Sequence, residues 1–215
     1  MITLTACGTT KAKETKNQTK ETKKWEPLKI SEQEKTQAQK EVKQISTICQ
    51  NIKIDKNKVT KKYLENLYQI LTKKGYPTAQ VGQESHGTKN APVKFKPSKT
   101  SHGDKLKTFY KQAKAGKTAD VTLLQQNTSG GFARIKLESR QGKTTGILTT
   151  IYREEDGSLS ISEMVKYKVK MLELSEKDVL TLEFYLSDQA ELQTDGVMRF
   201  QSVSYTHLTL PTTSR

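Results

Sequence analysis

The chain has 215 residues, of which 33% are hydrophobic and 28% are charged, and its formal net charge is +14. This length fits one ordinary domain with a tail, and the composition is polar without the very low hydrophobicity that keeps a whole chain disordered. No apolar run approaches the roughly 18 residues of a membrane-spanning helix, so the sequence predicts no such helix.

The first residues carry the pattern on which the expected location depends. Leu4-Thr5-Ala6-Cys7-Gly8 resembles the cleavage and acylation site of bacterial lipoproteins. The resemblance implies that Cys7 carries a lipid and that the mature protein is extracytoplasmic and anchored to the cell membrane. Only three residues precede this pattern, so we expect that most of the signal peptide is missing from the sequence. An accidental match in a cytosolic protein is the alternative.

The two ends of the chain are expected to lie outside the folded domain. Residues 1–29 are predicted to form a signal remnant, the lipidation site and a disordered tether rich in Lys and Thr, because too few apolar residues are present to offset the entropy of ordering. Residues 203–215 begin with a run that resembles a translated sequencing adapter, and we expect this tail to be non-native. A genuine polar tail is the alternative. The domain is then 30–202, truncated at its C-terminus.

Helical periodicity dominates the first part of the domain. Ser31 and Glu34 have the spacing of a capping box, and apolar residues at steps of three and four predict a helix over 30–52 with Cys49 on its buried side. A second helix is expected over 59–74, where Gly75 provides a left-handed cap. A third, over 105–115, begins after Asp104 as its N-cap.

From Val121 onwards the apolar residues alternate with polar ones, which is the pattern of half-buried strands joined by short turns. Such strands form an antiparallel β-meander with one face exposed to solvent. Helices followed by strands predict an α+β fold, with two or three N-terminal helices packed on one face of the antiparallel β-meander.

The clearest strand suggests a candidate anion-binding row. Lys166, Lys168 and Lys170 alternate with apolar residues, so a regular strand would place all three on one face at steps of about 7 Å. This geometry suits repeating phosphates or carboxylates. A lysine row also protects a sheet from edge-to-edge association, and that structural role is the alternative.

The sequence predicts neither a cofactor nor a metal site. His86 and His102 lie in similar Ser-His-Gly triplets, but they match no metal-ligand spacing. No catalytic residues are indicated, which favours a protein that is not an enzyme. Nucleic acid is not expected as a partner, because stacking aromatics do not accompany the basic row.

The segment Trp25-Glu26-Pro27-Leu28, the two capped helices, Lys74-Gly75-Tyr76-Pro77, the segment 111–117 and Gly130-Gly131-Phe132 together resemble a family of lipoproteins of unknown function from clostridial-type Gram-positive bacteria. The resemblance assigns no activity and no functional residue, and Cys7 rests on the separate lipoprotein pattern. We expect a membrane-anchored, extracytoplasmic accessory or binding protein without catalytic activity. Two alternatives remain open. The basic surface binds anionic envelope polymers or lipid headgroups, or the chain is a fragment of an enzyme whose active residues lie in the missing C-terminal part.

Overall fold

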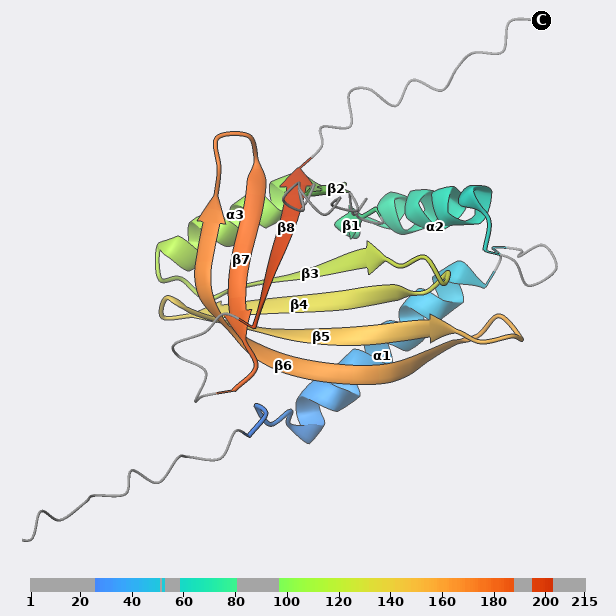
Figure 1. Cartoon of the computed structure of the whole chain (residues 1–215), viewed down its shortest axis with the longest axis horizontal. Helices are drawn as coiled ribbons and strands as arrows, with labels where there is room; N and C mark the ends of the chain where they lie inside the picture. The colour runs from blue at the N-terminus through green and yellow to red at the C-terminus, as the bar shows by residue number, and fades with distance from the viewer. Residues whose placement is uncertain (1–25, 51, 53–58, 81–96, 188–194, 203–215) are drawn as a thin grey trace, which may run out of the picture.

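The computed structural model describes residues 26–50, 52, 59–80, 97–187 and 195–202 (Figure 1). The helices are α1 (Glu32–Cys49), α2 (Lys61–Lys73) and α3 (Gly103–Lys114). The strands are β1 (Thr78–Ala79), β2 (Ser98–Thr100), β3 (Ala119–Gln126), β4 (Phe132–Arg140), β5 (Lys143–Arg153), β6 (Leu159–Leu174), β7 (Val179–Tyr185) and β8 (Gly196–Ser202). Cys7, most of the predicted tether, His86 and the predicted non-native tail lie outside the described residues.

The strands form a closed barrel in the order β1-β2-β8-β7-β6-β5-β4-β3. Strands β3 to β8 do follow one another as an antiparallel meander, but β1 and β2 join its two ends. β1 runs parallel to β3, with Thr78 opposite Leu124, and β2 runs parallel to β8, with Ser98 opposite Phe200. The prediction of helices on one face of an open meander is therefore wrong. The closing pairs join residues far apart in the chain, which local alternation cannot reveal.

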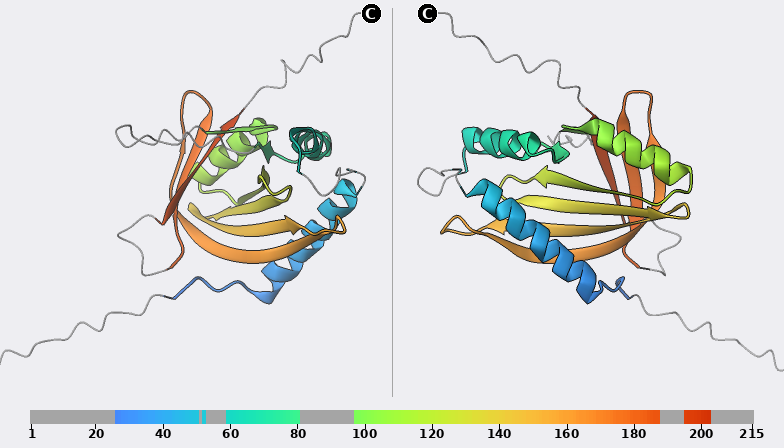
Figure 2. Two further views of the ribbon diagram at one scale, coloured as in Figure 1. Left: turned by 45° about the vertical axis from the view of Figure 1, so that its right-hand side comes forward. Right: turned by 180° about the vertical axis from the view of Figure 1, so that it is seen from behind.

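The helices also occupy different sides of the sheet. α1 crosses the outer face of the barrel, whereas α3 lies on the side of β7 and β8 (Figure 2). Leu106, Phe109 and Ala113 of α3 join the core cluster formed by the inward-facing residues of β3 to β8. Because β1 and β2 are only two and three residues long, they close the barrel over a short distance, and α3 packs against β3 and β8 beside them.

Strands β3 to β5 are buried on both faces. Leu123 and Leu124 point to opposite sides of β3, and both are fully buried. Leu123 belongs to the cluster inside the barrel, while Leu124 packs with Phe132 and Ile151 against α1 and α2. The expectation of one solvent-exposed face thus fails for these strands, because α1 and α2 cover the outer side.

Local signals placed the helix ends well. The capping box is present: the Ser31 side chain accepts from the Glu34 backbone N–H at 3.2 Å, and the Glu34 carboxylate accepts from the Ser31 backbone N–H at 2.8 Å. Gly75 adopts the expected left-handed conformation after α2, with φ +83°. The third helix is present as predicted, but its predicted N-cap was wrong: the N-cap is His102, at φ 48° and without a side-chain cap, and Asp104 lies in the first turn.

The longest strand, β6, departs from strict alternation. Its register with β7 shifts between Val169 and Met171, so that Leu172, and not Met171, is buried in the barrel core. Tyr167 points into the same core directly opposite Gly146 of β5. A Cβ atom at position 146 would overlap the Tyr167 ring, so glycine is required there.

Candidate functional site

A groove of about 600 Å³ lies between the first half of α1 and the outer face of β3 to β5. Its lining is almost entirely polar or charged, unlike the mainly apolar lining of ordinary small-molecule pockets. The lining residues are Ser31, Gln33, Glu34, Gln37, Glu41, Thr118, Ala119, Asp120, Arg134, Lys136, Glu138, Arg140 and Ile147.

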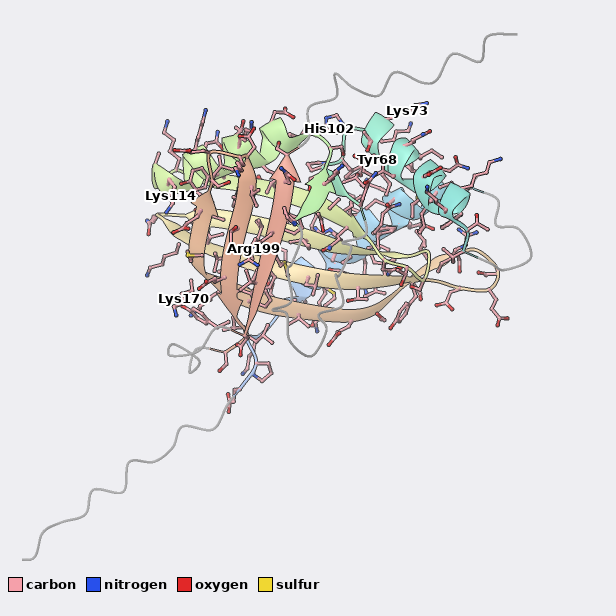
Figure 3. The ribbon with its side chains drawn as sticks, turned by 45° about the horizontal axis from the view of Figure 1, so that its top comes forward. Tyr68, Lys73, His102, Lys114, Lys170 and Arg199 are labelled. Atoms are coloured by element: carbon pink, nitrogen blue, oxygen red, sulfur yellow. The ribbon has the colours of Figure 1, made fainter. Side chains whose placement is uncertain are left out.

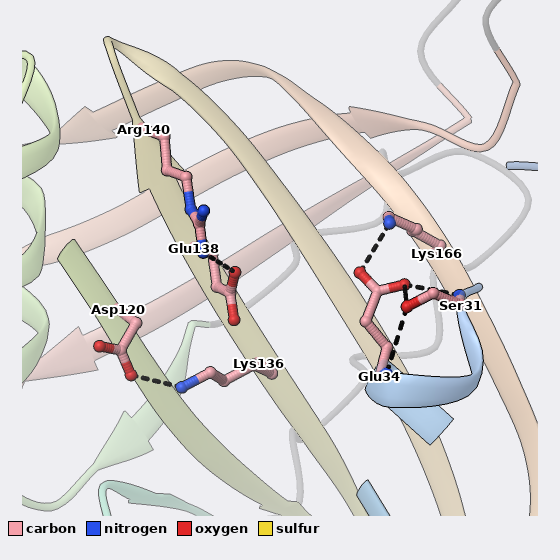
Figure 4. Close-up of polar contacts among 7 residues, drawn as sticks. All are labelled: Ser31, Glu34, Asp120, Lys136, Glu138, Arg140 and Lys166. Atoms are coloured by element: carbon pink, nitrogen blue, oxygen red, sulfur yellow. Dashed lines mark hydrogen bonds and ion pairs between the residues drawn. The ribbon is translucent and has the colours of Figure 1, made fainter. Parts of the chain in front are cut away.

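Glu34 joins one end of α1 to the sheet (Figure 4). Its Oε1 accepts a hydrogen bond from Lys166 Nζ on β6 at 2.6 Å, while its Oε2 accepts from Ser31. Burial by itself raises the pKa of Glu34, but the hydrogen bonds from Lys166 and Ser31 outweigh it and hold the pKa below its usual value. The carboxylate therefore stays ionised and holds both the helix end and the strand.

Two turns further along α1, Glu41 makes a second link to the sheet. Its Oε2 accepts from Arg134 Nε at 2.7 Å and lies 2.5 Å from Nη2, and its Oε1 accepts from Gln37 at 2.7 Å. The Arg134 side chain is only 2% exposed. A charged side chain is tolerated at this depth because both ions are paired and hydrogen-bonded. Polar positions of these strands were expected on the solvent-exposed face of the meander, so the burial of Arg134 corrects that expectation.

At the outer end of the groove, basic and acidic side chains form two oppositely charged pairs. Lys136 bonds to Asp120 of the neighbouring strand, and Arg140 Nη2 lies 3.8 Å from Glu138 Oε2 (Figure 4). Asp120 and Glu138 stand directly opposite each other, which is unfavourable for two like charges unless bases flank them. The groove thus contains nearly balanced acids and bases.

The structure places the predicted lysine row in three different settings. Lys166 is bonded to Glu34 and is 23% exposed, Lys168 is half-buried and has a partner of its own, and Lys170 is exposed at the register shift of β6. Anion binding by this row stays a prediction. Its most accessible member is Lys170, while Lys166 already serves an internal ion pair.

The sequence did not reveal that several exposed lysines of α2 and α3 lie along one side of the barrel. We call Lys62, Lys73, Lys74, Lys111, Lys114 and Lys117 the helical lysine surface; all six are exposed. Among the described residues, none of the six forms an ion pair, and Lys114 lies 5.8 Å from the centre of the Tyr110 ring. The high lysine content of the segment was the available signal, but it did not show which lysines remain uncompensated.

Cys49 is a core residue, as the helical periodicity predicted. It is 3% exposed and packs with Val42, Ile45 and Leu67 in the cluster between α1, α2 and the sheet. Burial raises the pKa of its thiol to about 11, against a smaller opposing effect of the Arg153 charge. At neutral pH the group is a thiol, which is a poor nucleophile.

No group of three or more His, Cys, Asp or Glu side chains in the described part of the chain is arranged to hold a metal ion. None of the helices in that part is both long enough and apolar enough to cross a membrane.

Comparison with known proteins gives one match. No curated protein and no solved structure matches the chain. Residues 31–204, which start at the N-cap of α1 and include the eight strands that the structure describes, match the family of unknown function DUF6070, and the chain belongs to that family.

Proposed function

We propose that this member of DUF6070 is an extracytoplasmic lipoprotein, anchored to the membrane through Cys7, that acts as a non-catalytic accessory or binding protein. The observation that carries the proposal is the run Leu4-Thr5-Ala6-Cys7. The described N-terminal residues are compatible with an anchored chain: Leu28 N donates to Leu186 O at 3.0 Å, and Pro27 bridges to Ser187. These contacts attach the segment that leads back to Cys7 to the end of β7.

Replacing the proposed lipid attachment site in the native cell tests the anchor. Cys7→Ser should abolish incorporation of labelled fatty acid and release the protein from the membrane fraction. Cys49→Ala is the matched control and should change neither result, because Cys49 is buried in the core. Membrane attachment and labelling that survive Cys7→Ser would refute the anchor.

A second function is favoured by the charge of the molecule. We infer that the anchored protein binds anionic polymers or lipid headgroups of the envelope through its basic surface, to which Lys166, Lys168 and Lys170 are candidate contributors. The net charge of +14 supports this, because uncompensated lysines attract polyanions. Retention on an anionic envelope polymer at physiological salt, weakened by higher salt, is the expected result. No retention at physiological salt would refute it.

A further inference from the structure

We propose that the helical lysine surface is the binding site for a linear phosphodiester polymer that carries no bases. This inference rests on the proposed binding of anionic polymers. It goes further by naming the surface and the chemical class of the polymer. It also shifts the role away from Lys166, whose charge is already paired with Glu34.

The two helices form one continuous support for this surface. The C-terminal end of α2 meets the N-terminal end of α3: Lys105 Nζ donates to Gly75 O at 2.5 Å, and His102 Nε2 lies 2.8 Å from Thr72 O. α2 and α3 follow each other along the same side of the barrel (Figure 1). With 13 and 12 residues at about 1.5 Å each, they offer a track of roughly 40 Å.

Lysines are present at both ends of this track. Figure 3 shows Lys73 on α2 and Lys114 near the far end of α3, on either side of the junction at His102. Lys62 and Lys73 are eleven residues apart, about three helical turns, so they share a face of α2. Lys111 and Lys114 are three residues apart and share a face of α3. Positive charge is therefore repeated along the line that a linear polymer would follow.

The uncompensated charge distinguishes this surface from the groove beside α1. In the groove, Arg134, Lys136 and Arg140 each lie against a carboxylate. On the two helices, the ion pairs among described residues are Lys61–Glu65 at 3.8 Å and Lys107–Asp178 at 2.7 Å, and both leave the helical lysine surface unpaired. A polyanion that binds there exchanges its counterions for these lysines without breaking an internal ion pair.

The shape of this side favours a thread-like polymer over a flat bilayer. The hairpin between β6 and β7 projects beyond α3 (Figure 1). It carries Glu176, an exposed acid that repels anionic headgroups, and Asp178, whose charge is paired with Lys107. The chain also enters α1 on the opposite side of the barrel from α2 and α3 (Figure 1), so the lysine surface faces away from the point where the anchoring segment leaves.

Base recognition is not supported by the side chains nearby. Proteins that bind single-stranded nucleic acid stack the bases on exposed aromatic rings. Among the described residues, the exposed large hydrophobic side chains are Tyr152 and Val197, and neither lies on α2 or α3. Tyr110 of α3 is half-buried and lies below Lys114. The polymer is thus expected to contribute phosphates alone.

The test compares two variants of the full chain that lose the same charge in different places. The first carries Lys62→Gln, Lys73→Gln, Lys111→Gln and Lys114→Gln. The control carries Lys29→Gln, Lys40→Gln, Lys43→Gln and Lys143→Gln, all at exposed positions outside α2 and α3. Glutamine is a good helix former, and circular dichroism melting checks that both variants fold.

Binding of fluorescent poly(glycerol phosphate) is measured by anisotropy from 50 to 300 mM salt. The first variant should bind on the order of 10- to 100-fold more weakly than the unmodified chain at 150 mM salt, and its log K–log salt slope should be shallower by about 3, since each lost contact contributes about 0.7. The control should lose less than about threefold. An oligonucleotide of equal charge and vesicles of phosphatidylglycerol should bind more weakly than the polymer.

The outcomes separate the surface from the broader proposal. If the unmodified chain does not bind the polymer at 150 mM salt, both the polymer proposal and this inference fail. If it binds but the two variants lose affinity equally, or the first variant loses none, only the assignment to the helical lysine surface is overturned. Tighter binding to the oligonucleotide or to the vesicles would overturn the polymer class.

Discussion

Glu34 in the first turn of α1 accepts a hydrogen bond from Lys166 on β6 at 2.6 Å, across 132 residues of chain. The same carboxylate closes the capping box with Ser31. The Glu34 side chain thus takes part both in the local capping of α1 and in a contact with a residue far away in the sequence. The sequence suggested Lys166 as a ligand for an external anion. In the folded chain, its charge is instead paired with the carboxylate of Glu34.

Glu34→Gln should therefore lower the free energy of unfolding by about 1 kcal/mol, since a glutamine at this capping-box position keeps hydrogen bonding but removes the charge that Lys166 binds. Urea unfolding followed by circular dichroism measures the change. Glu32→Gln is the matched control: Glu32 belongs to an exposed pair with Lys35 in the same turn, and its loss should cost much less. Equal effects of the two substitutions would show that the Lys166 contact adds nothing.

The contribution of Glu34 should also depend on pH in a defined direction. Its pKa is lowered in the folded state from the usual 4.5, so the folded chain binds a proton there less tightly than the unfolded chain. The stabilisation is present above pH 4.5 and is lost as the pH falls through the lower folded pKa. The difference between the unmodified chain and Glu34→Gln should be constant near pH 7 and decrease in acid. A difference that grows towards acid pH would contradict the assignment.

Arg134→Met should cost about 3–5 kcal/mol, because it leaves the Glu41 carboxylate beside the sheet without its base. Combining it with Glu41→Leu should recover a large part of this loss, since no uncompensated charge then remains. Denaturant unfolding of the two single variants and the double variant forms the necessary double-mutant cycle. Additive losses would show that the two side chains do not act as a pair.

Cys49 should react about 100-fold more slowly with a thiol reagent at pH 8 in the folded chain than in the unfolded chain. Its pKa of about 11 is two units above the usual 9.0, so far less thiolate is present, and its low exposure slows the reaction further. The measurement uses a Cys7→Ser background so that one thiol is followed. Rapid stoichiometric labelling without denaturant would contradict the burial of Cys49.

The same pKa shift predicts a loss of stability in alkali. The folded chain holds the Cys49 proton more tightly, so the stabilisation is complete below pH 9 and decreases towards pH 11, by about 2–3 kcal/mol in all. Comparison with Cys49→Ala isolates this effect from the tyrosines, because the variant keeps every other titrating group. If the variant loses stability in the same way over this interval, the effect does not come from the thiol.

Gly146→Ala should destabilise the barrel by about 1–3 kcal/mol, because the new methyl group would overlap the Tyr167 ring. Tyr167→Phe should be neutral or stabilising, since the buried Tyr167 hydroxyl has no hydrogen-bond partner among the described residues. Thermal unfolding measures both changes. In the double variant Gly146→Ala with Tyr167→Leu, the cost of the added methyl group should shrink; an unchanged cost would locate the clash elsewhere.

The order of the three helices and of the long strands could be predicted from the sequence, whereas their arrangement in space could not. The capping box at Ser31 and Glu34, the left-handed Gly75 and the antiparallel pairing of successive strands after Val121 were correct, because each depends on neighbouring segments of the chain. The N-cap of α3 was misplaced because His102 lacks the usual capping chemistry. Closure of the barrel depends on β1 and β2, which are too short to produce a recognisable alternation.

The candidate lysine surfaces likewise have features that the sequence predicts and features that only the fold reveals. A row of three lysines on β6 was visible as an alternation, but their environments were not, because the partner of Lys166 is Glu34 on a distant helix and a register shift interrupts the row. The lysines of α2 and α3 looked like ordinary solvated positions. They are distinguished only in the folded structure, where they lie on one side of the barrel with few acidic side chains beside them.

By itself, the sequence determined the helices, the order of the long strands and the burial of Cys49, while the lipoprotein pattern around Cys7 stays a prediction. Each follows from neighbouring residues, through backbone capping, apolar periodicity or a short motif. Only the tertiary structure decided that the sheet closes into a barrel, that Arg134 is buried against Glu41 across 93 residues, and which lysines keep an unpaired charge. Packing and ion pairing bring together residues that the chain keeps far apart, so these features appear only once the whole fold has formed.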